Sequence, residues 1–253
     1  MNIRPGLPPP QRLGAVVIER IDRGDNDYVV TFLTRENGLI AALAKNARHS
    51  VRRFGDGLLN PGRAAWYYIR SRPNAALSFV ERGEVNPRAP LLPPHPVCAA
   101  LAAKALELVK AFESQASPAE GSFNLILRHF KALSDLNNFS PPALKARRLS
   151  IGFVKCYLEL AGFGLNLTAE GNALELKPPQ WGDPNYSNQA DDPIWPLNCN
   201  LLKALELTNR HDACPELEEG DISLAESFFE HRASLDAGRG FKSLRVLKQL
   251  LGS

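Results

Sequence analysis

Apolar and polar residues alternate over the first 90 positions in short runs, and turn signals rich in glycine, asparagine or aspartate separate several of them. Alternation with a period of two over about four to eight residues is typical of half-buried β-strands. The pattern predicts strands over residues 15–21, 28–34, 39–44, 63–69 and 76–82. A long connection separates the third strand from the fourth, and the favoured structure is a small β-barrel.

The period becomes helical after a proline-rich linker, Pro90 to Pro96. Apolar positions then recur about every 3.6 residues, which is typical of amphipathic helices. Capping-box spacings predict helix starts at Ser117 to Glu120 and at Ser223 to Glu226. The predicted helical segments lie near residues 97–112, 118–133, 140–162, 201–205, 223–226 and 241–251.

These patterns predict an α+β protein in three parts. Residues 1–88 form a five-stranded OB-fold β-barrel, a fold widely used to bind single strands and oligosaccharides. Residues 89–167 and 197–253 form an all-α helical domain, in which the basic C-terminal helix packs back on the others. Residues 168–196 form an irregular insert, acidic and proline-rich.

Charge is unevenly distributed along the chain. Residues 1–90 carry a net charge of +6, whereas residues 168–236 carry −10. Such polarity is expected of a protein that meets a polyanion on one surface, although acidic stretches also serve solubility.

The strongest concentration of positive charge is residues 45–53, Lys-Asn-Ala-Arg-His-Ser-Val-Arg-Arg, which we call the basic loop. It follows the third predicted strand, so we expect the charge of Lys45, Arg48, Arg52 and Arg53 on a loop rather than along a helix. A loop can follow a phosphate backbone that is not a regular duplex. The alternative is a solvated face with no partner.

Further arginines lie at the predicted turns. Arg20 and Arg23 flank the first turn and Arg35 the second, and they would extend the basic surface if these loop ends share a face. Ordinary surface charge is the alternative for each.

Aromatic residues on the predicted strands could add flat surfaces on which bases stack. Alternation along Trp66, Tyr67 and Tyr68 requires at least one ring to point into the core. Tyr67 or a neighbour is the candidate for stacking.

Catalytic motifs are absent from the sequence: it has no glycine-rich phosphate cradle with its lysine, no nucleophile elbow and no zinc-protease helix motif. His211 with Cys214 and Cys199 could supply metal ligands, but without a paired-cysteine motif the signal is weak. We therefore expect a non-enzymatic protein without metal or cofactor.

The cellular compartment is predicted from two features. The four cysteines are scattered, which suits reduced thiols, and no apolar run reaches the length of a membrane span. The N-terminal ten residues also lack the apolar core of a signal peptide. A cytoplasmic protein is expected.

The chain resembles the RecO family of bacterial recombination mediators. The resemblance rests first on the barrel: on residues 15–20, 24–39 and 42–55, the last of which contains the basic loop. Residues 146–163 look like the family's central helix, and residues 241–250 match near the C-terminus. Many members carry a four-cysteine zinc module after the central helix, whereas residues 165–172 contain no cysteine, so the acidic insert is expected to replace that module.

The resemblance implies a role in DNA repair and recombination. Proteins of this family bind single- and double-stranded DNA, anneal complementary strands, and act with RecR to help RecA replace single-stranded-DNA-binding protein. Annealing implies phosphate contacts by Lys45, Arg48, Arg52 and Arg53 while the bases stay free. By analogy, the acidic tail of single-stranded-DNA-binding protein would dock on the helical region, beside Lys145, Arg147, Arg148 or Lys155. A bacterial, nucleoid-associated location is implied as well.

Two rival functions remain open from the sequence. An OB-fold protein that binds RNA in translation or RNA processing would need the same rings and cations. A metal-dependent nuclease would use Asp191 and Asp192.

Overall fold

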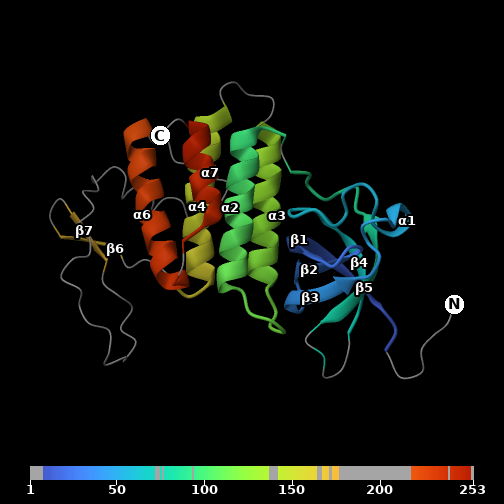
Figure 1. The fold of residues 1–253 in the computed structure, drawn as a ribbon. Helices are drawn as coiled ribbons and strands as arrows, with labels where there is room; N and C mark the ends of the chain where they lie inside the picture. The colour runs from blue at the N-terminus through green and yellow to red at the C-terminus, as the bar shows by residue number, and fades with distance from the viewer. Residues whose placement is uncertain are drawn as a thin grey trace. The chain divides into compact units, whose positions relative to one another are not determined.

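A computed structural model describes residues 8–71, 75, 77–92, 94–136, 142–163, 167–170, 173–176, 218–238 and 240–251. The chain divides into two compact units, residues 1–146 with 241–253, and residues 147–240. The first unit contains the strands of the N-terminal part, one short helical turn and three longer helices (Figure 1). The domain boundaries expected from the sequence, near residues 88 and 167, stay a prediction.

The N-terminal strands close into a five-stranded barrel in the order β1-β2-β3-β5-β4, which confirms the predicted fold. Neighbouring strands are antiparallel except β3 and β5, whose parallel seam has two pairs, Ala42 with Ser78 and Leu43 with Phe79. Each strand overlaps its predicted range. The first strand exceeds its predicted range most, because it begins at Gln11 and ends at Arg23 instead of covering residues 15–21. The strands are β1 (Gln11–Arg23), β2 (Asp27–Thr34), β3 (Gly38–Ala44), β4 (Ala64–Arg70) and β5 (Ser78–Val85).

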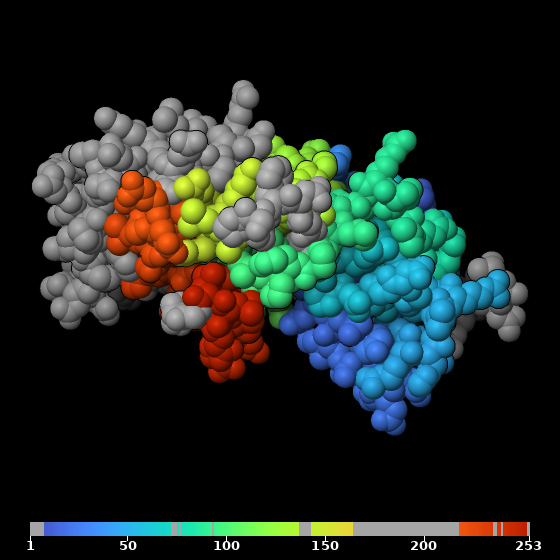
Figure 2. Space-filling model, turned by 90° about the horizontal axis from the view of Figure 1, so that it is seen from above, coloured from blue at the N-terminus to red at the C-terminus, as the bar shows by residue number. Residues whose placement is uncertain are grey.

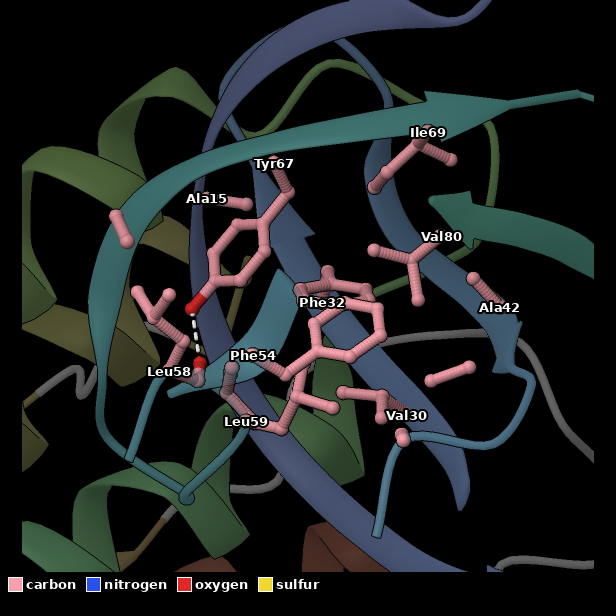
Figure 3. Close-up of a cluster of buried hydrophobic side chains, with 14 residues drawn as sticks. Ala15, Val30, Phe32, Ala42, Phe54, Leu58, Leu59, Tyr67, Ile69 and Val80 are labelled. Atoms are coloured by element: carbon pink, nitrogen blue, oxygen red, sulfur yellow. Dashed lines mark hydrogen bonds between the residues drawn. The ribbon is translucent and has the colours of Figure 1, made fainter. Parts of the chain in front are cut away.

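Tyr67 lies at the centre of the barrel core. Its side chain is fully buried, and its ring centroid is 4.6 Å from that of Phe32. The hydroxyl donates a hydrogen bond to the carbonyl of Leu58 (Figure 3). Burial raises the pKa of Tyr67 above its ordinary value, against the opposing effect of Arg63. The expectation that Tyr67 stacks on bases is therefore wrong, because alternation along β4 turns this ring inward.

The barrel is joined to the helices through the tight turn between β2 and β3. The amide of Leu39 donates to the carbonyl of Ser114 (3.1 Å), and the amide of Ala119 donates to the carbonyl of Arg35 (3.0 Å). Gly38 has a φ of +56°, and a Cβ there would lie 2.5 Å from the carbonyl oxygen of Ser117. Only glycine fits this junction without displacement.

Three helices complete the first unit: α2 (Pro96–Phe112), α3 (Glu120–Asp135) and α7 (Lys242–Leu251). The carboxylate of Glu107 on α2 accepts hydrogen bonds from the amide and the hydroxyl of Ser243, which fixes the start of α7 against α2. The C-terminal basic helix thus packs on a neighbouring helix as predicted. The capping box predicted at Ser117 is wrong, since Ala119 occupies the N-cap of α3 without a side-chain bond.

The second unit contains most of α4 (Pro142–Leu160), with β6 (Leu167–Glu170), β7 (Ala173–Leu176) and α6 (Glu219–Ala237). The strands β6 and β7 form a hairpin at the start of the insert that was predicted to be irregular. The helix α6 begins at Glu219, four residues before the predicted start, so Ser223 lies inside the helix, where its hydroxyl donates to the carbonyl of Glu219 instead of capping the N-terminus. The helical segment predicted near residues 201–205 and the insert beyond residue 176 lie outside the described residues.

Candidate nucleic-acid interface

The basic loop begins where β3 ends and is fixed to the turn between β1 and β2. The amide of Asn46 donates to Oδ1 of Asp27 (2.8 Å), and the amide of Arg48 donates to the carbonyl of Asn26 (3.2 Å). Part of the basic loop then forms a single helical turn, α1 (Val51–Phe54), whose last side chain is buried in the barrel core. The prediction that the charge of the basic loop lies on a loop rather than on a helix is wrong for Arg52 and Arg53, which belong to this helical turn. In Figure 1, α1 lies at the edge of the barrel away from α2 and α3.

Arg53 holds the basic loop together from within. Its Nε donates to the hydroxyl of Ser50 (2.7 Å), and its Nη2 donates to the carbonyl of Lys45 (2.6 Å). Its guanidinium also lies 5.0 Å from the centroid of the Phe54 ring. Arg53 therefore shapes the loop. Its position among the other cations of the basic loop predicts only a phosphate contact, so this structural role is visible only in the fold.

Arg20 and Arg23 lie at the same end of the barrel as the basic loop. In the register of β1 with β2, Arg20 pairs with Val30 and Arg23 with Asp27, at the start of β2. The last residue of β3, Ala44, pairs with Tyr28 at this same end. The structure thus places the turn between β1 and β2 beside the basic loop, so Arg20 and Arg23 meet the condition for extending its basic surface.

Tyr28 joins the cations of these two turns. The Arg20 guanidinium lies 4.7 Å from the centroid of its half-buried ring, and that of Arg48 lies 5.5 Å away. Arg20 also donates to Oδ1 of Asn60 (2.8 Å). Tyr28 is the first residue of a predicted strand, but only the strand register shows that it lies beside the basic loop.

Carboxylates accompany the cations at this end of the barrel, although the basic loop itself has none. Arg48 pairs with Asp22 at 3.1 Å. Arg23, Lys45 and Arg52 are exposed and form no ion pair within the described part of the chain. The Nζ of Lys45 lies 5.3 Å from the ring centroid of Phe79. In Figure 2 the chain around residue 50 projects from the molecular surface.

Arg35 does not belong to this cluster, so its predicted place in the basic surface is wrong. It follows the last residue of β2 and lies seven residues beyond Tyr28, which corresponds to roughly 23 Å along a strand. Its guanidinium donates to Oδ1 of Asn124 (3.0 Å) and lies 3.5 Å from the carboxylate of Glu120. Arg35 joins the barrel to α3.

The cations predicted to receive an acidic partner have different environments. Arg147 is buried and holds Glu226 through two nitrogens, with distances of 3.0 Å and 2.7 Å to Oε2. Hydrogen bonding to Glu226 raises the pKa of Arg147, against desolvation by burial. Lys155 is buried with its Nζ 3.5 Å from Glu159, Arg148 is half-buried and Lys145 is exposed. The expectation that Arg147 and Lys155 present their charge to a partner is therefore wrong.

The described residues offer neither a metal-binding cluster nor a membrane-spanning helix. No group of three or more His, Cys, Asp or Glu side chains there could hold a metal ion. No helix there has the length and apolar character to cross a membrane. Cys199, His211, Cys214, Asp191 and Asp192 lie outside the described part of the chain.

Comparison with known proteins gives consistent results for the barrel. A family model described as the N-terminal part of recombination protein O matches residues 11–87. A DNA repair protein RecO of Desulfatibacillum aliphaticivorans is 28% identical over 159 residues, which are 63% of this chain and 59% of the relative. One of the same name from Anaeromyxobacter sp. strain K is 33% identical over 138 residues, or 54% of each chain. The aligned region thus spans little more than half the length of these relatives.

Proposed function

The chain belongs to the RecO family through its N-terminal domain, and from that premise we propose that it acts in DNA repair and recombination. The proposed activity is binding of single- and double-stranded DNA through phosphates and annealing of complementary strands. It is a non-enzymatic activity, located at the bacterial nucleoid in the cytoplasm.

The basic end of the barrel is the observation that carries the proposal. Lys45 and Arg52 are exposed on the basic loop, which Arg53 and the hydrogen bonds of the Asn46 and Arg48 amides hold in one shape, and Arg23 is exposed at the adjoining end of β1. Contacts from such cations to phosphates fix the position of a strand and carry no sequence information directly. Annealing requires this arrangement, since the neutralised strands approach each other while their bases stay free to pair.

The proposed partners follow from the family. We propose that the protein acts with RecR to help RecA replace single-stranded-DNA-binding protein, whose acidic tail binds the helical region. We assign the first contact of such a tail to Lys145, because its side chain is exposed whereas that of Arg147 is buried.

An annealing assay with fluorescent complementary strands tests the proposal at several salt concentrations. The informative variant replaces Arg23, Arg48 and Arg52 with Gln and keeps Arg53, which the fold needs. If all three contact phosphates, the salt slope of binding falls by about 2.7 for duplex and about 2.1 for single strands. The matched control is Lys131→Gln on α3, which removes one cation already paired with Asp135 and leaves the slope unchanged.

Three results would contradict the proposal. Equal annealing and binding by wild type and the triple variant would show that the basic end meets no DNA. A clear preference for RNA over single-stranded DNA of equal length would assign the barrel to RNA, and shortening of DNA in the presence of Mg²⁺ would indicate a nuclease.

A further inference from the structure

The outer face of β1, β4 and β5 carries three half-buried aromatic rings outside the barrel core, Trp66 and Tyr68 on β4 and Phe79 on β5. In the register of β4 with its neighbours, Tyr68 lies between Arg12 and Arg82, and Trp66 lies between Gly14 and Glu84. Phe79 and Arg70 form the next pair along the same face. We call this set the outer ladder: Arg12, Gly14, Trp66, Tyr68, Arg70, Phe79, Arg82 and Glu84.

Each ring of the outer ladder is held in place by its neighbours. The Arg12 guanidinium lies 4.3 Å from the Trp66 ring centroid, and the Arg82 guanidinium lies 3.7 Å from that of Tyr68. A Cβ at position 14 would lie 3.2 Å from the Trp66 ring, so glycine allows this ring to lie close against β1. The rings are therefore ordered before any ligand binds.

The charge of the outer ladder favours an anionic ligand. Arg12 and Arg82 share one carboxylate, that of Glu84, at 3.4 Å and 2.7 Å. Both guanidinium side chains remain 49% exposed, and a planar guanidinium on a ring offers its outer face to a base. Arg70 is satisfied by Glu81 and by the carbonyl of Pro8 and adds no free charge.

The outer ladder is continuous with the basic loop. Lys45 lies over the ring of Phe79, which pairs with Arg70 across β4 and β5, and Tyr68 and Trp66 follow along β4. Successive outward positions on a strand are roughly 6.6 Å apart, about twice the 3.4 Å rise of a stacked DNA strand. The two rings thus match bases that are unstacked, which an extended single strand supplies and a duplex does not.

We propose that the outer ladder binds single-stranded DNA by stacking bases on the Trp66 and Tyr68 rings through the guanidinium groups that cover them, as a continuation of the phosphate contacts made by the basic loop. The inference rests on the proposed function and adds to it a surface that distinguishes single strands from duplex. A strand leaving the basic loop along this face is held with its bases apart.

The test measures affinity by fluorescence anisotropy for three probes of equal length: a thymidine oligonucleotide, the same backbone without bases, and a duplex. Trp66→Thr and Tyr68→Thr keep a residue suited to a strand but remove the rings. Each is expected to weaken thymidine binding roughly fivefold to a hundredfold, the equivalent of about 1–3 kcal/mol per stacked base. Binding of the abasic strand and of the duplex is expected to stay at the wild-type level.

Conservative variants and salt dependence distinguish stacking from a loss of structure. Trp66→Phe and Tyr68→Phe keep a ring and are expected to retain most of the affinity, and the salt slope is expected to stay unchanged in every ring variant. Wild-type thymidine binding by both Thr variants would overturn the proposal, and so would an equal loss for all three probes.

The basic-loop variant separates this inference from the proposed function. If replacement of Arg23, Arg48 and Arg52 weakens all probes while the Thr variants bind as wild type does, the basic loop binds DNA and the outer ladder does not. If wild type binds none of the probes, both the inference and the proposed function fail.

Discussion

Adjacent arginines of the basic loop are predicted to respond differently to the same substitution. Arg53→Lys keeps the charge but loses the planar fork, which now bonds Ser50 through Nε and the carbonyl of Lys45 through Nη2. Arg52→Lys keeps the charge of a side chain that extends into solvent. The two variants therefore separate the shape of the loop from its charge.

The magnitude follows from the hydrogen bonds that are lost. Each bond of Arg53 contributes about 1 kcal/mol net, so Arg53→Lys removes about 2 kcal/mol from the ordered loop. If this energy is lost from DNA binding, affinity falls by a factor of roughly 30, because 1.4 kcal/mol corresponds to a factor of ten. The salt slope is expected to stay at its wild-type value, since the number of cations is unchanged.

The assay is anisotropy of a labelled duplex over a series of salt concentrations, with Arg52→Lys and Arg52→Gln as controls. Arg52→Lys is expected to bind as wild type does, and Arg52→Gln to lower the slope by about 0.9. Wild-type affinity for Arg53→Lys would refute the structural role of Arg53. A lower slope in that variant would show instead that Arg53 contacts phosphate.

Three further predictions concern stability, measured by denaturant unfolding. Tyr67→Phe is expected to lower the free energy of unfolding by about 1–3 kcal/mol, because the Leu58 carbonyl loses its buried donor. Folding raises the pKa of the Tyr67 hydroxyl, so this residue makes the wild type lose stability as the pH rises above about 10, and an equal loss in the variant would contradict this. Glu226→Ala is expected to lower the free energy of unfolding by about 3–5 kcal/mol, because the buried Arg147 loses the carboxylate it is hydrogen-bonded to. The double variant Arg147→Met with Glu226→Leu is expected to lose less, and equal stability of Glu226→Ala and wild type would show that the pair is dispensable. Gly38→Ala is expected to destabilise the fold more than Gly24→Ala, since both positions have positive φ but only a Cβ at position 38 collides with the Ser117 carbonyl. Similar losses of stability would mean that the backbone around Gly38 can move to accommodate the Cβ.

The barrel was predictable from the sequence because its signals are local. Alternation along residues 28–34 and 39–44 identified two strands, and the register then placed Ala44 opposite Tyr28. The same alternation left open which ring of Trp66, Tyr67 and Tyr68 lies inside, and only the closed barrel with the hydrogen bond to Leu58 answers that.

The roles of individual cations were not predictable, because they depend on contacts between residues distant in sequence. Arg35 binds Asn124, 89 positions later, and Arg147 binds Glu226, 79 positions later. Arg53 differs from Arg52 only in its direction, which a single helical turn sets. Charge alone marked all of these residues equally.

The short parallel seam between β3 and β5 also bears on how the protein folds. Its two residue pairs, Ala42 with Ser78 and Leu43 with Phe79, join segments 36 positions apart, whereas the hairpin of β2 and β3 joins neighbours. Closing a long loop costs more chain entropy than closing a short one, so such pairings form late. Phe79 reaches its place beneath Lys45 only when the seam is made. A chain that has formed its hairpins but not its seam therefore has all the cations of the basic loop without the surface that continues from them.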